Sequence, residues 1–181
     1  MKAGTIYSNF KARDNREVTL RAPDWKDLDD LLFYINSLVE EQAEIQRTSK
    51  LTRSREADWL GRHLAAVEND RKAAIVAEVD GNLVGQLEVQ PKIGYFSHIG
   101  EVGIGLLSPY RDVGIGTMMM IEAEKHVEDI GVEILYLEVF ASNSRARHVY
   151  EKVGYRETGV IPRGAKRNGK YIDMIQMVKD L

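Results

Sequence analysis

The chain has 181 residues, 44% of them hydrophobic, which is enough for one domain with a buried core. The absence of cysteine excludes disulfides, thiolate metal sites and a cysteine nucleophile, and the formal net charge of −3 gives no reason to expect nucleic acid as a partner. No apolar run could cross a membrane and the first residues lack a hydrophobic leader, so a cytoplasmic protein with no membrane partner is expected.

The N-terminal part predicts one strand and two helices. A short strand is expected at residues 18–21. Asp24 and Ser54 are candidate N-caps of two helices, whose apolar residues recur at helical spacing. Residues 40–53, between these helices, are polar and irregular, and we expect a mobile segment there.

The middle of the chain predicts a hairpin followed by a further strand. The runs 73–79 and 83–89 are strand-like, and Asp80-Gly81-Asn82 joins them. Glycine and asparagine tolerate the positive φ that tight hairpin turns require, so this is a strong hairpin signal. Another strand is predicted at 99–107.

The C-terminal part continues the alternation of helices and strands. A helix is expected to begin near Ile115 and to end at Gly131, and the apolar run 132–140 predicts a buried strand. The last elements are a short helix and two strands around a basic loop, at residues 143–152, 155–160 and 171–178.

These elements define the expected fold class and domain organisation. The helix between strands 99–107 and 132–140 makes them a right-handed parallel pair, whereas the other neighbours can pair as antiparallel hairpins. We therefore expect an α+β fold, a mixed and mostly antiparallel sheet of about seven strands flanked by about four helices. Residues 1–16 are interpreted as an N-terminal extension and residues 17–181 as a single domain.

The motif Arg111-Asp112-Val113-Gly114-Ile115-Gly116 carries the strongest functional signal. It follows a predicted strand and opens a helix, so its backbone N–H groups lie around a tight turn at the positive end of the helix dipole. Glycine lets the backbone approach an anion closely. The motif therefore predicts a phosphate site.

Two common phosphate loops do not match. The dinucleotide-binding pattern requires a third glycine where this chain has Met119, and it belongs after the first strand of a doubly wound sheet. The Walker loop requires Gly-Lys-Ser/Thr, and neither Gly114 nor Gly116 is followed by lysine.

The motif order resembles that of the GNAT family of acyl-CoA-dependent N-acyltransferases. Arg-x-x-Gly-x-Gly is followed by a helix, a strand, Asn143 and a segment ending in Tyr150-Glu-Lys-Val-Gly-Tyr155. The tail 163–177 is similar to the subgroup that contains spermidine and protein N-terminal acetyltransferases. The resemblance extends from about Val18 to the C-terminus. It implies a pair of central parallel strands that splay apart.

The resemblance implies acetyl-CoA as cosubstrate. The amides from Val113 to Thr117 would hold its diphosphate, with Arg111 adding positive charge, although a solvated arginine is also compatible. The pantetheine arm would pair with the strand at 99–107. The predicted cofactor-binding residues are Ile104, Gly105, Leu106, Arg111, Asp112, Val113, Gly114, Ile115, Gly116, Thr117 and Asn143.

Within that strand, Gly103 and Gly105 are consistent with a bulge that opens the pair, or with close packing against a helix. Asn143 can also act simply as a helix N-cap.

Two residues are candidates for proton transfer. The resemblance makes Tyr150 the general acid that protonates the leaving thiolate, although it could also be a core aromatic residue. Glu101 is the candidate base for the amine, with a charged pair or a role in orienting the substrate as the alternatives, and His98 is the second candidate. His63, His126 and His148 lack partners at metal spacing, so no metal site is predicted.

The resemblance implies that the protein can form a homodimer, as family members often do. The sequence does not distinguish between a protein N-terminus, a polyamine and a small amine as the acceptor. Its pocket is expected from residues 40–53 and 160–171. A non-catalytic acyl-CoA-binding regulatory module and an adenine-nucleotide binder are the alternatives to an enzyme. Release of free CoA with an amine, or competition by ATP, would distinguish them.

Overall fold

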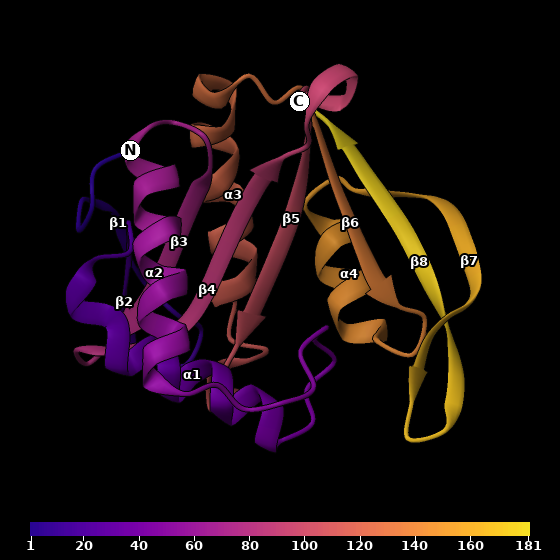
Figure 1. Ribbon diagram of the computed structural model, residues 1–181, viewed down its shortest axis with the longest axis horizontal. Coiled ribbons are helices and arrows are strands. Elements are labelled where there is room, and N and C mark those ends of the chain that lie inside the picture. The colour runs from indigo at the N-terminus through magenta and orange to yellow at the C-terminus, as the bar shows by residue number, and fades with distance from the viewer.

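The computed structural model describes all residues, 1–181, and its centre is one mixed sheet (Figure 1). The eight strands are β1 (Ile6–Lys11), β2 (Glu17–Arg21), β3 (Ala73–Val79), β4 (Asn82–Pro91), β5 (Ile99–Leu106), β6 (Ile134–Phe140), β7 (Arg156–Arg167) and β8 (Lys170–Asp180). Their spatial order is β1-β2-β3-β4-β5-β6-β8-β7, and only β5 and β6 run parallel. The predicted α+β class is confirmed.

Helices cover both faces of the sheet. The helices are α1 (Leu28–Glu40), α2 (Arg53–Glu68), α3 (Ile115–Val127) and α4 (Ser144–Lys152). In Figure 1, α1 and α2 lie in front of the sheet, and α3 and α4 lie behind it. Two buried clusters fill these layers because neighbouring strand residues point to opposite faces: Ile75 and Ala77 belong to the cluster with α3, and Val76 to the cluster with α1 and α2.

The helix ends follow the expected capping rules with two corrections. Asp24 is the N-cap of the short 3-10 turn Trp25–Asp27, and the N-cap of α1 is Asp27. The side chain of Thr52, and not Ser54, caps α2, accepting a hydrogen bond from the Arg55 amide at 3.5 Å. As predicted, α3 begins at Ile115, and the turn that follows it ends at Gly131, whose φ is 75°.

The strand β1 was not predicted, and it lies within the residues interpreted as an extension. It pairs antiparallel with β2 at the edge of the sheet. Every residue of β1 is at least partly exposed, so its sequence lacks the apolar alternation of a half-buried strand. Asn15, with a φ of 68°, closes the turn between the two strands.

The predicted basic loop near the C-terminus is instead a long hairpin. β7 and β8 continue past residues 160 and 171 and meet at a turn formed by Asn168 and Gly169, both with positive φ. Asn-Gly is the preferred sequence for this turn type, because both central residues have left-handed backbone conformations. Residues 161–170 are therefore mostly strand, and Figure 1 shows the hairpin tip projecting from the rest of the sheet.

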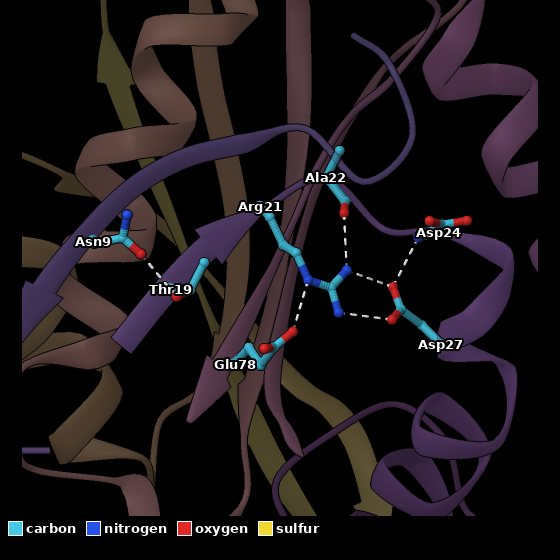
Figure 2. A network of polar contacts seen from close by, with 7 residues as sticks. All are labelled: Asn9, Thr19, Arg21, Ala22, Asp24, Asp27 and Glu78. Carbon is cyan, nitrogen blue, oxygen red and sulfur yellow. Dashed lines mark hydrogen bonds and ion pairs between the residues drawn. The ribbon is translucent and has the colours of Figure 1, made fainter. Parts of the chain in front are cut away.

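A buried ion pair connects β2 to the start of α1. Figure 2 shows the Arg21 guanidinium donating to both carboxylate oxygens of Asp27, each at 2.7 Å. The same guanidinium donates to Glu78 of β3 at 2.9 Å, and Asp27 also accepts from the Asp24 amide at 2.7 Å. Arg21 and Asp27 are 4% and 1% exposed, so this network fixes the first helix against the sheet.

Candidate functional site

The parallel strands β5 and β6 pair over only the first part of their length. Their register comprises Ile99–Ile134, Gly100–Leu135 and Glu101–Tyr136 and ends there. Beyond this point β5 remains paired with β4, and β6 with β8. The two strands therefore diverge toward their C-terminal ends, as Figure 1 shows. The expected splayed pair is confirmed.

The free edge of β5 is formed by the backbone of alternate residues. The Leu107 amide donates to the Val84 carbonyl of β4 at 2.9 Å. Because bonded residues alternate along an antiparallel pair, Gly105 also directs its backbone groups to β4. The backbone groups of Ile104 and Leu106 consequently face the side on which β6 has diverged.

The glycines of β5 do not form the predicted bulge. The register between β4 and β5 is continuous from Pro91–Gly100 to Gly85–Leu106. A Cβ on Gly105 would lie 2.4 Å from the Tyr34 hydroxyl oxygen of α1, so this glycine permits the close approach of a buried helix. Close packing against a helix, the alternative explanation for this glycine, is therefore correct.

The phosphate-loop motif forms a tight turn at the start of α3. Gly114 is the N-cap and has a φ of 95°, a conformation that residues with a Cβ rarely adopt. No protein carbonyl accepts a hydrogen bond from the amides of residues 112–117. A Cβ on Gly116 would lie 3.2 Å from Leu106 Cδ1, so this glycine brings the helix start close to β5. The turn thus presents several free donors at the open end of the splay.

The charged residues of this turn have protein partners. Arg111 Nε donates to the Leu106 carbonyl at 2.8 Å, and its terminal nitrogen pairs with Glu41. Asp112 pairs with Arg145 of α4 at 3.3 Å, and both side chains are exposed. The Arg111 side chain thus ties the turn to β5, and its net charge is offset by Glu41.

The second helix at the open end is α4. Asn143 caps it, as predicted, by accepting a hydrogen bond from the Ala146 amide at 3.0 Å. Because α3 follows β5 and α4 follows β6, both helix N-termini lie outside the carboxyl ends of the diverging strands. In open sheets with parallel strands this is where ligands bind.

Tyr150 lies on α4 and packs partly buried against the cluster behind the sheet. Ile104 and Leu106 of β5 contact the same cluster. The centroid of the Tyr150 ring is 6.0 Å from that of the Tyr155 ring. Burial raises the pKa of the Tyr150 phenol to about 12, so the hydroxyl keeps its proton at neutral pH.

Glu101 is exposed and is the last residue of β5 that pairs with β6. Its Cα partner, Tyr136, donates a hydrogen bond to Glu138, and Gln176 of β8 donates to the Tyr136 oxygen at 2.9 Å. Burial, the Glu138 hydrogen bond and the nearby Glu101 charge raise the pKa of Tyr136 to about 12. This polar group was missed because the run 132–140 was interpreted as uniformly buried; alternating Tyr136 and Glu138 were the available signal.

The two candidate proton-transfer groups, Glu101 and Tyr150, lie on opposite faces of the sheet. Residues 101, 103 and 105 of β5 share one face, because strand side chains alternate, and Gly105 on that face contacts α1. Ile104 and Leu106 face α3. Glu101 therefore lies on the α1 side of the sheet, and Tyr150 lies on the α4 side.

The segment between α1 and α2 is irregular, as predicted, and it contacts both diverging strands. Glu41 pairs with Arg111 after β5, and Glu44 accepts from the Ser142 hydroxyl after β6 at 2.6 Å. The Gln42 carbonyl accepts from Arg167 of the β7–β8 hairpin. The segment therefore extends across the open end on the α1 side.

Other candidate residues lie apart from this region. His98 precedes β5 at the end where β5 and β6 are still paired, and its carbonyl accepts hydrogen bonds from the Glu133 and Ile134 amides at 2.8 and 3.1 Å. No three His, Cys, Asp or Glu side chains are grouped so that they could hold a metal ion. None of the helices has the length and apolar character needed to cross a membrane.

Comparison with known proteins identifies the family. The model of the acetyltransferase (GNAT) family matches residues 34–155, which extend from Tyr34 in α1 through α4 and end just before β7. An N-alpha-acetyltransferase of Sulfurisphaera tokodaii is 37% identical over 101 residues, covering 49% of this chain and 59% of that protein. The chain belongs to the GNAT family of acetyltransferases.

Solved structures share the fold. The acetyltransferase of GNAT family from Streptococcus pneumoniae superposes with a TM-score of 0.81 at 25% identity, covering 91% of this chain and 99% of that one. yncA from Salmonella typhimurium, solved with acetyl-CoA, has a TM-score of 0.80 at 16% identity, covering 91% and 94%. The predicted family, fold and enzyme class are confirmed, and so is acetyl-CoA as the cosubstrate.

Proposed function

We propose that this protein transfers the acetyl group of acetyl-CoA directly to a primary amine. The observation that carries the proposal is the early end of the β5–β6 pairing beside the free amides of residues 112–117. A strand edge and a ring of N–H donors match the two polar parts of CoA, its peptide-like pantetheine arm and its diphosphate.

The donor is held mainly by the backbone in this proposal. Amides of residues 112–117 bind the diphosphate, and the Ile104 backbone and the Leu106 N–H pair with the pantetheine amides, since the Leu106 carbonyl already accepts from Arg111. Gly105 provides space for Tyr34 and makes no hydrogen bond to the donor. Asn143 caps α4 beside the arm. Arg111 holds the turn in place through the Leu106 carbonyl, and its charge is paired with Glu41.

The acetyl group is transferred in the gap between the diverging strands β5 and β6, which can be reached from both faces of the sheet. The amine nitrogen forms a bond with the acetyl carbon as the carbon–sulfur bond breaks. Glu101 accepts the proton that the amine loses, directly or through water, and Tyr150 donates its phenolic proton to the leaving thiolate. Backbone N–H groups of the free β5 edge stabilise the charge that develops on the carbonyl oxygen. No covalent enzyme intermediate is required.

The acceptor enters from the α1 side. Glu101 and Glu138 lie on this face of the sheet, and Glu44 lies on the segment that crosses the open end. Several carboxylates at one opening favour a positively charged amine. A protein or peptide N-terminus is the first acceptor to test, because a relative is named as an N-alpha-acetyltransferase; polyamines and small amines are the other two classes.

The test is an acetylation assay with purified protein, acetyl-CoA and one acceptor from each class. Free CoA thiol and acetylated product, identified by mass spectrometry, are measured together. Acetylated amine from any class supports the proposal. Tight CoA binding without product from any class would instead support the non-catalytic acyl-CoA-binding module, and equal competition by ATP and CoA would support a nucleotide binder.

A further inference from the structure

The turn between β1 and β2 contacts the phosphate-loop motif, although it is about 100 residues away in sequence. The Arg13 amide donates to the Val113 carbonyl at 3.0 Å. Arg16 donates to the Pro109 carbonyl at 2.8 Å, and its guanidinium lies 4.3 Å from the centroid of the Tyr110 ring. The turn therefore holds the chain on both sides of Arg111.

Arg13 brings its guanidinium close to Gly114, the N-cap of α3. A Cβ placed on Gly114 would lie 3.8 Å from Arg13 Nε and 3.9 Å from Arg13 Cγ. The Arg13 side chain thus runs along the N-cap of α3, beside the amides that have no acceptor in the protein.

Arg13 differs from the other arginines around the loop in having no acidic partner. Arg16 pairs with Asp14, Arg111 with Glu41 and Arg145 with Asp112. Arg13 is exposed and forms no salt bridge or side-chain hydrogen bond with the protein. An arginine fork beside free backbone donors suits a phosphate group, because both supply N–H groups to its oxygens.

We propose that Arg13 is a further donor-binding residue, and that its guanidinium binds the diphosphate of CoA. This inference rests on the proposed function for the location of the diphosphate. The β1–β2 turn then contributes in two ways. Arg16 and the Arg13 amide support the loop, and the Arg13 side chain supplies an unpaired positive charge, which Arg111 of the motif does not because it pairs with Glu41.

The test compares the binding of CoA, dephospho-CoA and pantetheine to wild-type protein and to the Arg13→Gln variant by calorimetry. We expect Arg13→Gln to weaken CoA and dephospho-CoA binding about tenfold, as for loss of a charge-assisted hydrogen bond at an exposed site, and to leave pantetheine binding unchanged. Arg13→Lys should retain part of the affinity. Lys11→Gln is the matched control, because Lys11 is on the same hairpin and pairs with Glu17 at 3.2 Å.

Three results would overturn the inference. CoA affinity of Arg13→Gln within twofold of wild type would show that the guanidinium does not contact the donor. A loss that disappears with dephospho-CoA would move the contact to the 3′-phosphate. An equal loss with pantetheine would mean that the substitution disturbs the loop. Failure of the wild-type protein itself to bind CoA would instead contradict the proposed function.

Discussion

Glu101 of β5 and Tyr136 of β6 are the last residues at which the two parallel strands pair, and past them the sheet opens. This position places Glu101 where β5 and β6 begin to diverge, with its side chain on the α1 side. A Glu101→Gln variant should lower kcat/KM for the amine by about 100-fold, the lower end of what a general base contributes, without changing CoA affinity.

The measurement for Glu101 is steady-state kinetics with the best acceptor, together with CoA binding. Glu133→Gln is a suitable control, because Glu133 is an exposed residue just before β6. A raised KM with an unchanged kcat would show that Glu101 orients the amine and does not take its proton.

Tyr150 is expected to act on turnover. Tyr150→Phe removes only the hydroxyl, so the ring can still pack against the cluster behind the sheet. We expect kcat to fall by about 100-fold while the Kd for acetyl-CoA stays within twofold. Stopped-time product assays and calorimetry on the same preparation check both numbers. Unchanged turnover would leave Tyr150 with a packing role alone.

Gly105 should be intolerant of a side chain, in contrast to Gly103. The Cβ of Gly105→Ala would lie 2.4 Å from the hydroxyl of buried Tyr34, and we expect a loss of about 1–3 kcal/mol in the free energy of unfolding, as for other overpacked cores. Gly103→Ala is the control, because its Cβ would meet Glu88 Cγ at an ordinary 3.7 Å. Urea unfolding compares the two. Equal stabilities would show that α1 can shift away from β5.

Local signals in the sequence predicted the elements that carry the site. Asp80-Gly81 specified the hairpin between β3 and β4, and both residues have positive φ in the structure. The glycine at the start of α3 and Gly131 at the end of its last turn also act within a few residues of the chain. Capping and turn chemistry depend on near neighbours, and so they can be predicted without knowledge of the tertiary fold.

Features that depend on distant residues were not predicted. The pair Arg111–Glu41 joins residues 70 positions apart, and the contact between Arg13 and Val113 joins residues still further apart. The strand β1 was missed because edge exposure removes its apolar pattern. The role of Gly105 depends on Tyr34, which only the packing of α1 on the sheet brings near.

The buried pair Arg21–Asp27 should contribute much more to stability than a comparable pair nearby. Asp27→Ala leaves the Arg21 charge buried without its bidentate partner, and we expect a loss of about 3–5 kcal/mol in the free energy of unfolding. Asp29→Ala is the matched control, because Asp29 pairs with Arg53 at an exposed position, and its denaturation midpoint should change little. A small effect of Asp27→Ala would mean that Glu78 alone compensates Arg21.

His63 should make stability depend on pH in a defined direction. It lies on the buried face of α2, stacks on Trp59 with ring centroids 4.4 Å apart, and has its Nδ1 3.5 Å from the Lys72 ammonium and 3.4 Å from Glu88. Burial and the Lys72 charge lower its pKa from 6.5 to about 4. Between these two values the unfolded chain binds a proton that the folded protein does not, so the free energy of unfolding falls as the pH decreases through this window.

Urea unfolding at several pH values across this window tests the effect, with His63→Gln as the variant and His148→Gln as the control. His148 is exposed on α4, and its variant should keep the wild-type slope of stability against pH. Removal of His63 should flatten that slope even if it also lowers the stability at neutral pH, because the proton uptake that generates the slope is lost. An unchanged slope in His63→Gln would mean that Lys72 and Glu88 rearrange to let the folded protein accept the proton.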